Sequence, residues 1–184
     1  MTPSELAHEL ASGRVRPAYL IAGAEALLRD EALAAIRLAA LGDAKTVAIR
    51  GLRNDTFEPG LETLVSDALA REFLRRGALR VVDDPARADL VISGSVAQLT
   101  VSRKSFSSIA LALEYELRLG LAVKIARRDG TVVPLDASAQ IETERYVASA
   151  DVEVERTHRE EALRRLASLL AGRIHDALFE RIAP

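Results

Sequence analysis

The chain has 184 residues, of which 49% are hydrophobic, so it has room for one sizeable core or for one core and a small appendage. It contains no cysteine, which excludes disulfides, thiolate metal sites, a thiol nucleophile and lipid attachment to a cysteine of this sequence. The net charge of −2 provides no general attraction for polyanions, so we expect no nucleic-acid partner, and any phosphate site must be a local cluster.

From the residues at the beginning of the sequence we expect no export signal. Met1 to Glu5 is polar and acidic instead of basic and then apolar, and no apolar run approaches the roughly 20 residues that cross a bilayer. As written, the chain is expected in the cytoplasm unless its start is misassigned.

The first 42 residues predict a helix, a strand and a second helix. Thr2-Pro3-Ser4-Glu5 has the form of a capping box, so a short helix should run to about Ser12. Ala18–Ala22 is an apolar run typical of a buried strand, and the Ala/Leu-rich stretch Glu25–Leu41 predicts a helix. Gly42 marks a break, which we take as the boundary of a separate N-terminal appendage.

The next segments alternate between strands and a helix. Pro59 suits a first helical turn, the apolar residues after it repeat at three and four, and Gly77 is a natural stop. Three further segments predict strands, the first followed by a loop at Gly51–Asp55: Thr46–Ile49, Leu79–Val82 and Asp89–Leu99.

The strongest pattern is a strict period of two between Ile109 and Ile125, where every odd-numbered residue is apolar. It predicts one half-buried antiparallel strand whose odd side chains face the helices. At about 3.4 Å per residue its length would be roughly 55 Å, so we expect a bend, with Gly120 its natural place. Asp129-Gly130 predicts a hairpin, and Thr131–Tyr146 should return beside the long strand as an edge strand, or one bulged at Pro134.

The last helix is predicted from a second capping box. Thr157-His158-Arg159-Glu160 should open it, and leucines and an isoleucine form one apolar stripe to Leu178. Two helices with one apolar face each and a sheet apolar on one side predict the α+β class. The expected architecture is a two-layer sandwich of a mixed, largely antiparallel sheet with two helices on one face, and a helix-strand-helix appendage before it.

No pattern indicates catalysis, a cofactor or a metal. His8, His158 and His175 lie far apart without metal-ligand spacing, so we interpret them as solvated or capping residues. Ser93-Gly94-Ser95 lacks a nucleophile-elbow frame and indicates close backbone packing. The carboxylate pairs Glu114/Glu116 and Glu142/Glu144 have the spacing of a solvated strand face, which we favour over the alternative of a functional acid pair.

Basic residues gather at expected turns. Arg103-Lys104 lies in the predicted loop before the long strand, and Arg127-Arg128 lies at the far end of that strand. Arg156, His158 and Arg159 surround the expected start of the last helix, where exposed amides add partial positive charge. Such clusters suit phosphate, although loop arginines are often merely solvated.

A series of segments resembles the LptE family in order and covers about three quarters of the chain. They are Arg53–Glu62, Asp83–Gly94, the long strand with Leu113-Glu114-Tyr115-Glu116, and the helix Glu160–Leu178. The resemblance implies a non-catalytic lipopolysaccharide-assembly domain over residues 45–184, working at the periplasmic face of the outer membrane with an LptD-type β-barrel and lipopolysaccharide as partners. It also implies that lipid A phosphates meet Arg103 or Lys104 and Arg156 or Arg159.

Residues 1–42 resemble a different family. Arg16–Glu25 and the helix containing Leu28–Ala32 are similar to the start of the DNA polymerase III delta subunit. A natural fusion, a wrong start or an artificial chimera would each account for this. Two alternative functions follow, a cytoplasmic clamp-loader-associated protein and a general protein-binding scaffold.

Overall fold

The computed structural model describes residues 3–12, 32, 35–36, 44–106 and 112–182. Helix α1, Pro3–Ala11, confirms the first predicted helix. The expected strand Ala18–Ala22 lies outside the described residues, as does most of the expected helix Glu25–Leu41.

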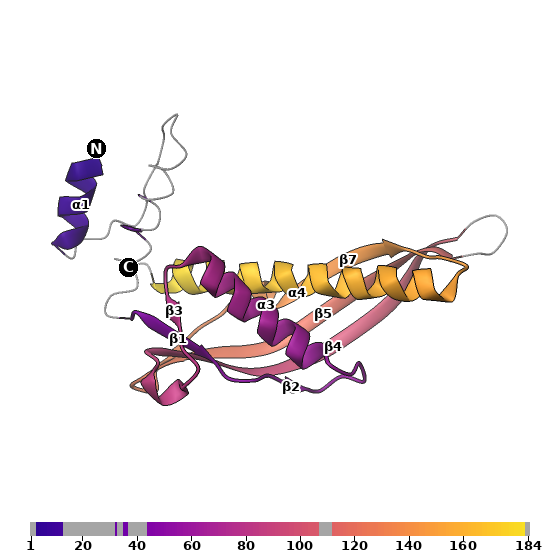
Figure 1. Cartoon of the computed structure of the whole chain (residues 1–184), viewed down its shortest axis with the longest axis horizontal. Helices are drawn as coiled ribbons and strands as arrows, with labels where there is room; N and C mark the ends of the chain where they lie inside the picture. Colours follow the sequence, from indigo (N-terminus) through magenta and orange to yellow (C-terminus); the bar gives the residue numbers. More distant parts are fainter. Residues whose placement is uncertain (1–2, 13–31, 33–34, 37–43, 107–111, 183–184) are drawn as a thin grey trace.

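From residue 44 onward the chain forms one seven-stranded mixed sheet with two long helices on one face (Figure 1). The strand order is β3-β1-β4-β5-β6, with β2 also paired to β4 and β7 to β5. The elements are β1 Thr46–Ile49, β2 Arg53–Asn54, α3 Leu61–Arg76, β3 Arg80–Val81, the 3-10 helix η1 Pro85–Arg87, β4 Leu90–Phe106, β5 Ala112–Arg127, β6 Val132–Val133, the 3-10 helix η2 Ala137–Gln140, β7 Ile141–Val147 and α4 Val152–Ile182. The predicted α+β class with two helices on one face is confirmed.

Strand β5 carries the period-two pattern as predicted. Its odd-numbered apolar side chains from Leu117 to Ile125 are buried against α3 and α4. The opposing stripe of α4 is buried as well, including Leu166, Leu170 and Ile174. Residues 109–111 of the predicted strand lie outside the described residues.

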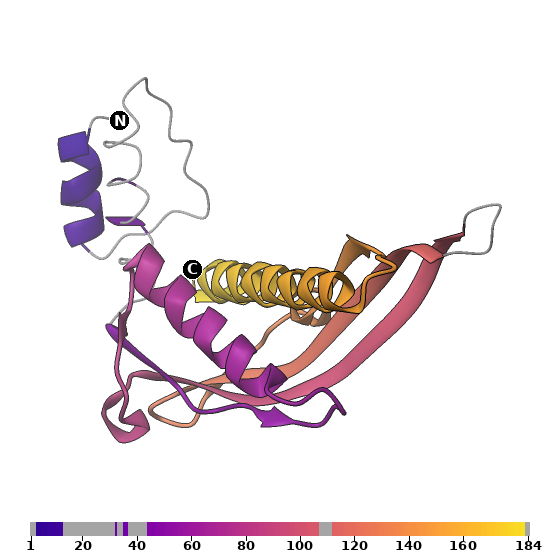
Figure 2. The same cartoon turned by 45° about the vertical axis from the view of Figure 1, so that its right-hand side comes forward.

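The sheet bends where β4 carries one extra residue. Val96 pairs with Leu121 but Gln98 pairs with Gly120, so Ala97 is a bulge opposite the glycine where we expected the bend. Figure 2 shows β4 and β5 curving together past the helices. The bulge also reverses which side chains of β4 face the helices. Before Ala97 these are the even-numbered residues, and after it they are the odd-numbered ones.

Close backbone packing at Gly94 is confirmed. This glycine has a φ of 150°, and a Cβ built on it would lie 2.0 Å from the Ala122 carbonyl oxygen on β5.

Strand β7 corrects the interpretation of Glu142 and Glu144 as a solvated pair. Both residues share the face of Leu119 and Leu117, their partners on β5, and therefore point toward α4. Arg173 of α4 lies 2.7 Å from Glu142, and Arg165 donates to Glu144 at 2.7 Å. At these two positions the edge of the sheet is thus held to α4 by charge pairs.

Three predicted boundaries differ in the structure. Helix α3 begins at Leu61, after Gly60 in the left-handed conformation, so Pro59 precedes it, whereas Gly77 ends it as predicted. The expected loop at Gly51–Asp55 contains the short strand β2, which pairs with β4. The return strand is interrupted after β6 at Pro134 and resumes only at β7.

Candidate functional site

Arg103 and Lys104 lie within β4 and not in a loop, because β4 stays paired with β5 as far as Phe106. Their side chains belong to opposite faces of the sheet. Arg103 pairs across the ladder with Tyr115 on the helix face, whereas the Lys104 ammonium lies 2.8 Å from Glu116 on the outer face. The hydrogen bond from Lys104 lowers the pKa of Glu116, and Arg145 adds to the effect. Lys104 is therefore partly neutralised, and Arg103 is not ion-paired to any described residue.

Arg156 and Arg159 lie inside α4, which corrects the predicted helix start. The Asp151 side chain accepts from the amides of Glu153 and Val154, at 2.9 and 3.2 Å, so it caps a helix that begins at Val152. The Thr157 hydroxyl, expected to be that cap, donates back to the Glu153 carbonyl at 2.9 Å. Free helix-terminal amides consequently do not support a phosphate site at Arg156 or Arg159.

Both α4 arginines already have carboxylate partners. Arg156 is exposed and bonds to Glu153 at 2.9 Å and Glu160 at 3.5 Å. Arg159 is half-buried and donates to both Glu58 oxygens, at 2.7 and 2.6 Å. These hydrogen bonds hold the pKa of Glu58 below its ordinary value of 4.5. An external anion would have to compete with a bidentate pair at Arg159.

Two tyrosines connect the basic residues across the helix face. Tyr115 on β5 stacks against Tyr146 on β7, with ring centroids 5.4 Å apart. Burial raises the pKa of Tyr146 to about 12, and the nearby Glu155 carboxylate acts in the same direction while Arg159 opposes it. Arg103, Tyr115 and Tyr146 therefore lie side by side on three adjacent strands. The charge of Arg159 acts on the pKa of Tyr146.

A groove of about 350 Å³ opens between the loop after β2 and strand β4. Arg159 lies at one wall, and the other lining residues are Asp55, Thr56, Phe57, Glu58, Ala97, Gln98, Leu99 and Val101. Phe57 is 107% exposed and Val101 45% exposed, so the groove presents apolar surface to solvent. Sequence reasoning missed this groove, although Phe57 within a polar loop was a usable signal.

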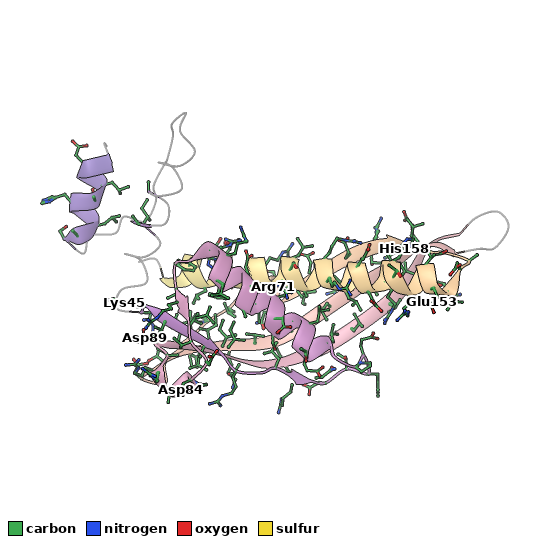
Figure 3. All side chains as sticks on the ribbon, in the orientation of Figure 1. Lys45, Arg71, Asp84, Asp89, Glu153 and His158 are labelled. Carbon is green, nitrogen blue, oxygen red and sulfur yellow. The ribbon has the colours of Figure 1, made fainter. Side chains whose placement is uncertain are left out.

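Of the predicted basic pair Arg127-Arg128, Arg128 has a structural role. Arg128 lies 2.9 Å from Asp89 and donates to the Arg87 and Ala88 carbonyls, which ties the β5–β6 hairpin to η1. Figure 3 shows Asp89, the partner of Arg128, at the end of the domain opposite His158. The basic group at Arg128 and the one around His158 are therefore separate.

The histidine interpretation needs one correction. His175 is buried between the rings of Phe73 and Phe179, with centroids at 5.0 and 4.5 Å, and is not solvated. The ring of His158 lies 2.9 Å from the Val147 carbonyl. The described residues contain no cluster of His, Cys, Asp and Glu that suits a metal ion, and no described helix has both the length and the apolarity of a membrane-spanning one.

Comparison with known proteins identifies the family to which the chain belongs. The sequence pattern of LptE, described as lipopolysaccharide-assembly, matches residues 44–178. The chain belongs to the LptE family. The match begins where the N-terminal segment ends, so the similarity of residues 1–42 to a clamp-loader subunit stays a prediction.

Three solved structures are similar in fold to the sheet and helices described above. A putative lipoprotein from Caulobacter crescentus CB15 is 14% identical with a TM-score of 0.53, covering 80% of this chain and 98% of that one. A hypothetical protein from Chlamydia trachomatis is 11% identical with a TM-score of 0.51, covering 73% and 98%. Lipoprotein B from Nitrosomonas europaea is 16% identical with a TM-score of 0.50, covering 76% and 83%. No curated protein matches the chain in sequence.

Within the LptE-like domain, the structure does not gather the four predicted site residues into one cluster. Lys104 lies on the outer face of the sheet, and Arg156 and Arg159 are engaged along α4. Arg103 is the exposed cation of this set that has no ion pair among the described residues.

Proposed function

We propose that residues 45–184 form a non-catalytic lipopolysaccharide-assembly module that binds lipopolysaccharide and an LptD-type β-barrel at the periplasmic face of the outer membrane. The observation that carries the proposal is the LptE-family match over residues 44–178.

Arg103 is the proposed first contact for a lipid A phosphate. Phosphate oxygens accept charge-assisted hydrogen bonds that are about twice as strong as neutral ones, and guanidinium presents two donors at once. Lys104, Arg156 and Arg159 stay candidates, but each would have to leave a carboxylate to bind a phosphate. We therefore rank these three residues below Arg103 as phosphate contacts.

Two measurements test the two halves of this function. Titration of the purified full chain with lipopolysaccharide should show saturable binding that weakens as salt is added. Co-expression with an LptD-type barrel should yield a stable complex after detergent extraction. Binding to lipopolysaccharide without a complex would leave the ligand role alone, and the absence of both would refute the proposal.

A further inference from the structure

The far half of β4 is an open edge of the sheet. Strand β2 pairs with β4 only at Ser95 and Val96, and the ladder ends with the Asp55 amide donating to the Val96 carbonyl at 3.0 Å. On the other side of the β4–β5 pair, β7 covers β5. Beyond Val96, no described strand pairs with the outer edge of β4.

The register identifies the backbone groups at this edge. Along this stretch, even-numbered residues of β4 pair with even-numbered residues of β5, whose backbone amides and carbonyls are directed toward β4. The pairs are Gln98 with Gly120, Thr100 with Arg118 and Ser102 with Glu116. The backbone amides and carbonyls of the odd-numbered residues of β5 are directed away from β4. The Val123 amide shows this direction, because it donates to the Gln140 side chain. Because backbone direction alternates along a strand, the amides and carbonyls of Leu99, Val101 and Arg103 face the open edge.

The side chains along the edge add apolar contact and charge. Leu99 and Val101 line the groove with Phe57, whose side chain is fully exposed. Two charges mark the ends of this stretch. Arg103 lies toward one end, and Asp55 lies toward the other, half-exposed, with Arg53 3.9 Å away. An unprotected edge with apolar side chains favours pairing with another strand.

We infer that the segment Leu99–Arg103 pairs antiparallel with the same segment of a second copy of this chain, around a two-fold axis at Val101. This register sets Leu99 opposite Arg103 of the second copy, and the reverse. Because Leu99 and Asp55 line the same groove, each copy brings a guanidinium to the acidic loop of the other. A two-fold interface requires such self-complementary ends, and this edge has them. The regular stretch lies between register shifts at Ala97 and Lys104, which limits pairing to these residues.

The first test uses proline at the centre of the edge. Sedimentation velocity of the full chain over about a hundredfold range of concentration should show a monomer–dimer equilibrium. Val101→Pro removes an amide that the β4–β5 ladder does not use, which edge strands tolerate, so the monomer should keep its circular dichroism spectrum. Its dimer dissociation constant should rise by about tenfold or more, while Val101→Thr, which keeps the amide, should stay near the parent value.

The second test exchanges the charges at the two ends and does not depend on the proline variant folding. Arg103→Glu and Asp55→Arg should each weaken the dimer several-fold, and the double variant should recover most of the loss because its charges are complementary again. A parent chain that is monomeric throughout, a Val101→Pro variant that dimerises like the parent, or a double variant weaker than both single variants would overturn the inference. Lipopolysaccharide is absent from these measurements, so they are independent of the proposed function.

Discussion

Arg159 of α4 and Glu58 in the loop before α3 form a bidentate pair across 101 residues of sequence, with nitrogen–oxygen distances of 2.7 and 2.6 Å. The Arg159 side chain is 30% exposed and the Glu58 side chain 26% exposed. The pair holds the loop that carries Phe57 against α4 and so shapes one wall of the groove beside β4.

Breaking this pair should destabilise the domain. Arg159→Met keeps most of the side-chain volume but leaves the half-buried Glu58 carboxylate without its partner, so we expect the free energy of unfolding to fall by about 1–3 kcal/mol. Arg156→Met is the matched control, because its ion pairs are exposed to solvent and should contribute little to stability. Urea unfolding of both variants at neutral pH measures the difference, and equal losses would contradict the expectation.

Glu72 should make the stability of the helix pair depend on pH. Hydrogen bonds from Arg75 and then Arg76 lower its pKa from 4.5 to about 2, and Arg76 also bonds to Asp176 of α4. Because the folded pKa is the lower one, the ionised carboxylate stabilises the fold above pH 4.5, and this contribution is lost as the pH falls toward 2. The difference in free energy of unfolding between the parent and Glu72→Gln should shrink over that window. A difference that stays constant with pH would show that Glu72 does not act through its charge.

The fold was largely predictable, because its main elements follow patterns that are local in sequence. Leu117 to Ile125 alternate strictly, and Gly77 ends a helix of period 3.6, so neither needs knowledge of its neighbours. The start of α4 was predicted wrongly, since Thr157 and Glu160 imitate a capping box while Asp151 is the cap. The Ala97 bulge was not predictable either, because it is a relation between two strands.

The candidate site was less predictable for a related reason. Whether an arginine is available to a ligand depends on carboxylates that are distant in sequence. Glu58 engages Arg159, Glu116 engages Lys104, and Glu144 engages Arg165. Charge and local position therefore made four residues equally good candidates for a phosphate contact: Arg103, Lys104, Arg156 and Arg159. Only the packed structure shows that Arg103 differs from the others in having no ion pair among the described residues.

Gly94 should tolerate no side chain. Gly94→Ala would place a Cβ 2.0 Å from the Ala122 carbonyl oxygen at a φ of 150°, so β4 and β5 would have to separate. We expect a loss of about 3 kcal/mol or more, or failure to fold. Gly120→Ala on the partner strand is the control, because its nearest contact is 3.7 Å and the change should cost about 1 kcal/mol or less. Thermal unfolding measures both, and equal tolerance would show that the close approach is not needed.

The domain should fold without the N-terminal appendage. The buried core cluster is drawn from residues 44–179, and the buried Leu6 of α1 does not belong to it. We therefore expect the fragment Lys45–Pro184 to unfold cooperatively, with a denaturant slope close to that of the full chain. Denaturant titration followed by circular dichroism tests this, and loss of cooperative unfolding would show that the boundary near Gly42 is wrong.

Arg103→Glu should weaken lipopolysaccharide binding while leaving the fold intact. Arg103 is exposed on β4 and has no ion pair among the described residues, so its reversal breaks no described charge pair, whereas Lys104→Glu would set two carboxylates together at Glu116. A loss of about 1–3 kcal/mol is expected, the usual scale for hydrogen bonds to charged groups. Reversal of Arg103 and Lys104 together should weaken binding at least as much.

The control for this experiment is Arg71→Glu, which makes the same change of charge at an exposed position on α3 (Figure 3). Titrations with lipopolysaccharide at protein concentrations where the chain is monomeric, with circular dichroism of each variant, separate a specific contact from general attraction. If Arg71→Glu lowers the affinity as much as Arg103→Glu, the binding reflects net charge, since screened surface charges act without regard to position. If a folded Arg103→Glu variant binds like the parent, Arg103 does not contact the ligand, and a phosphate would then have to be met by an arginine that releases its carboxylate, with Arg156 the first to examine because its partners are exposed.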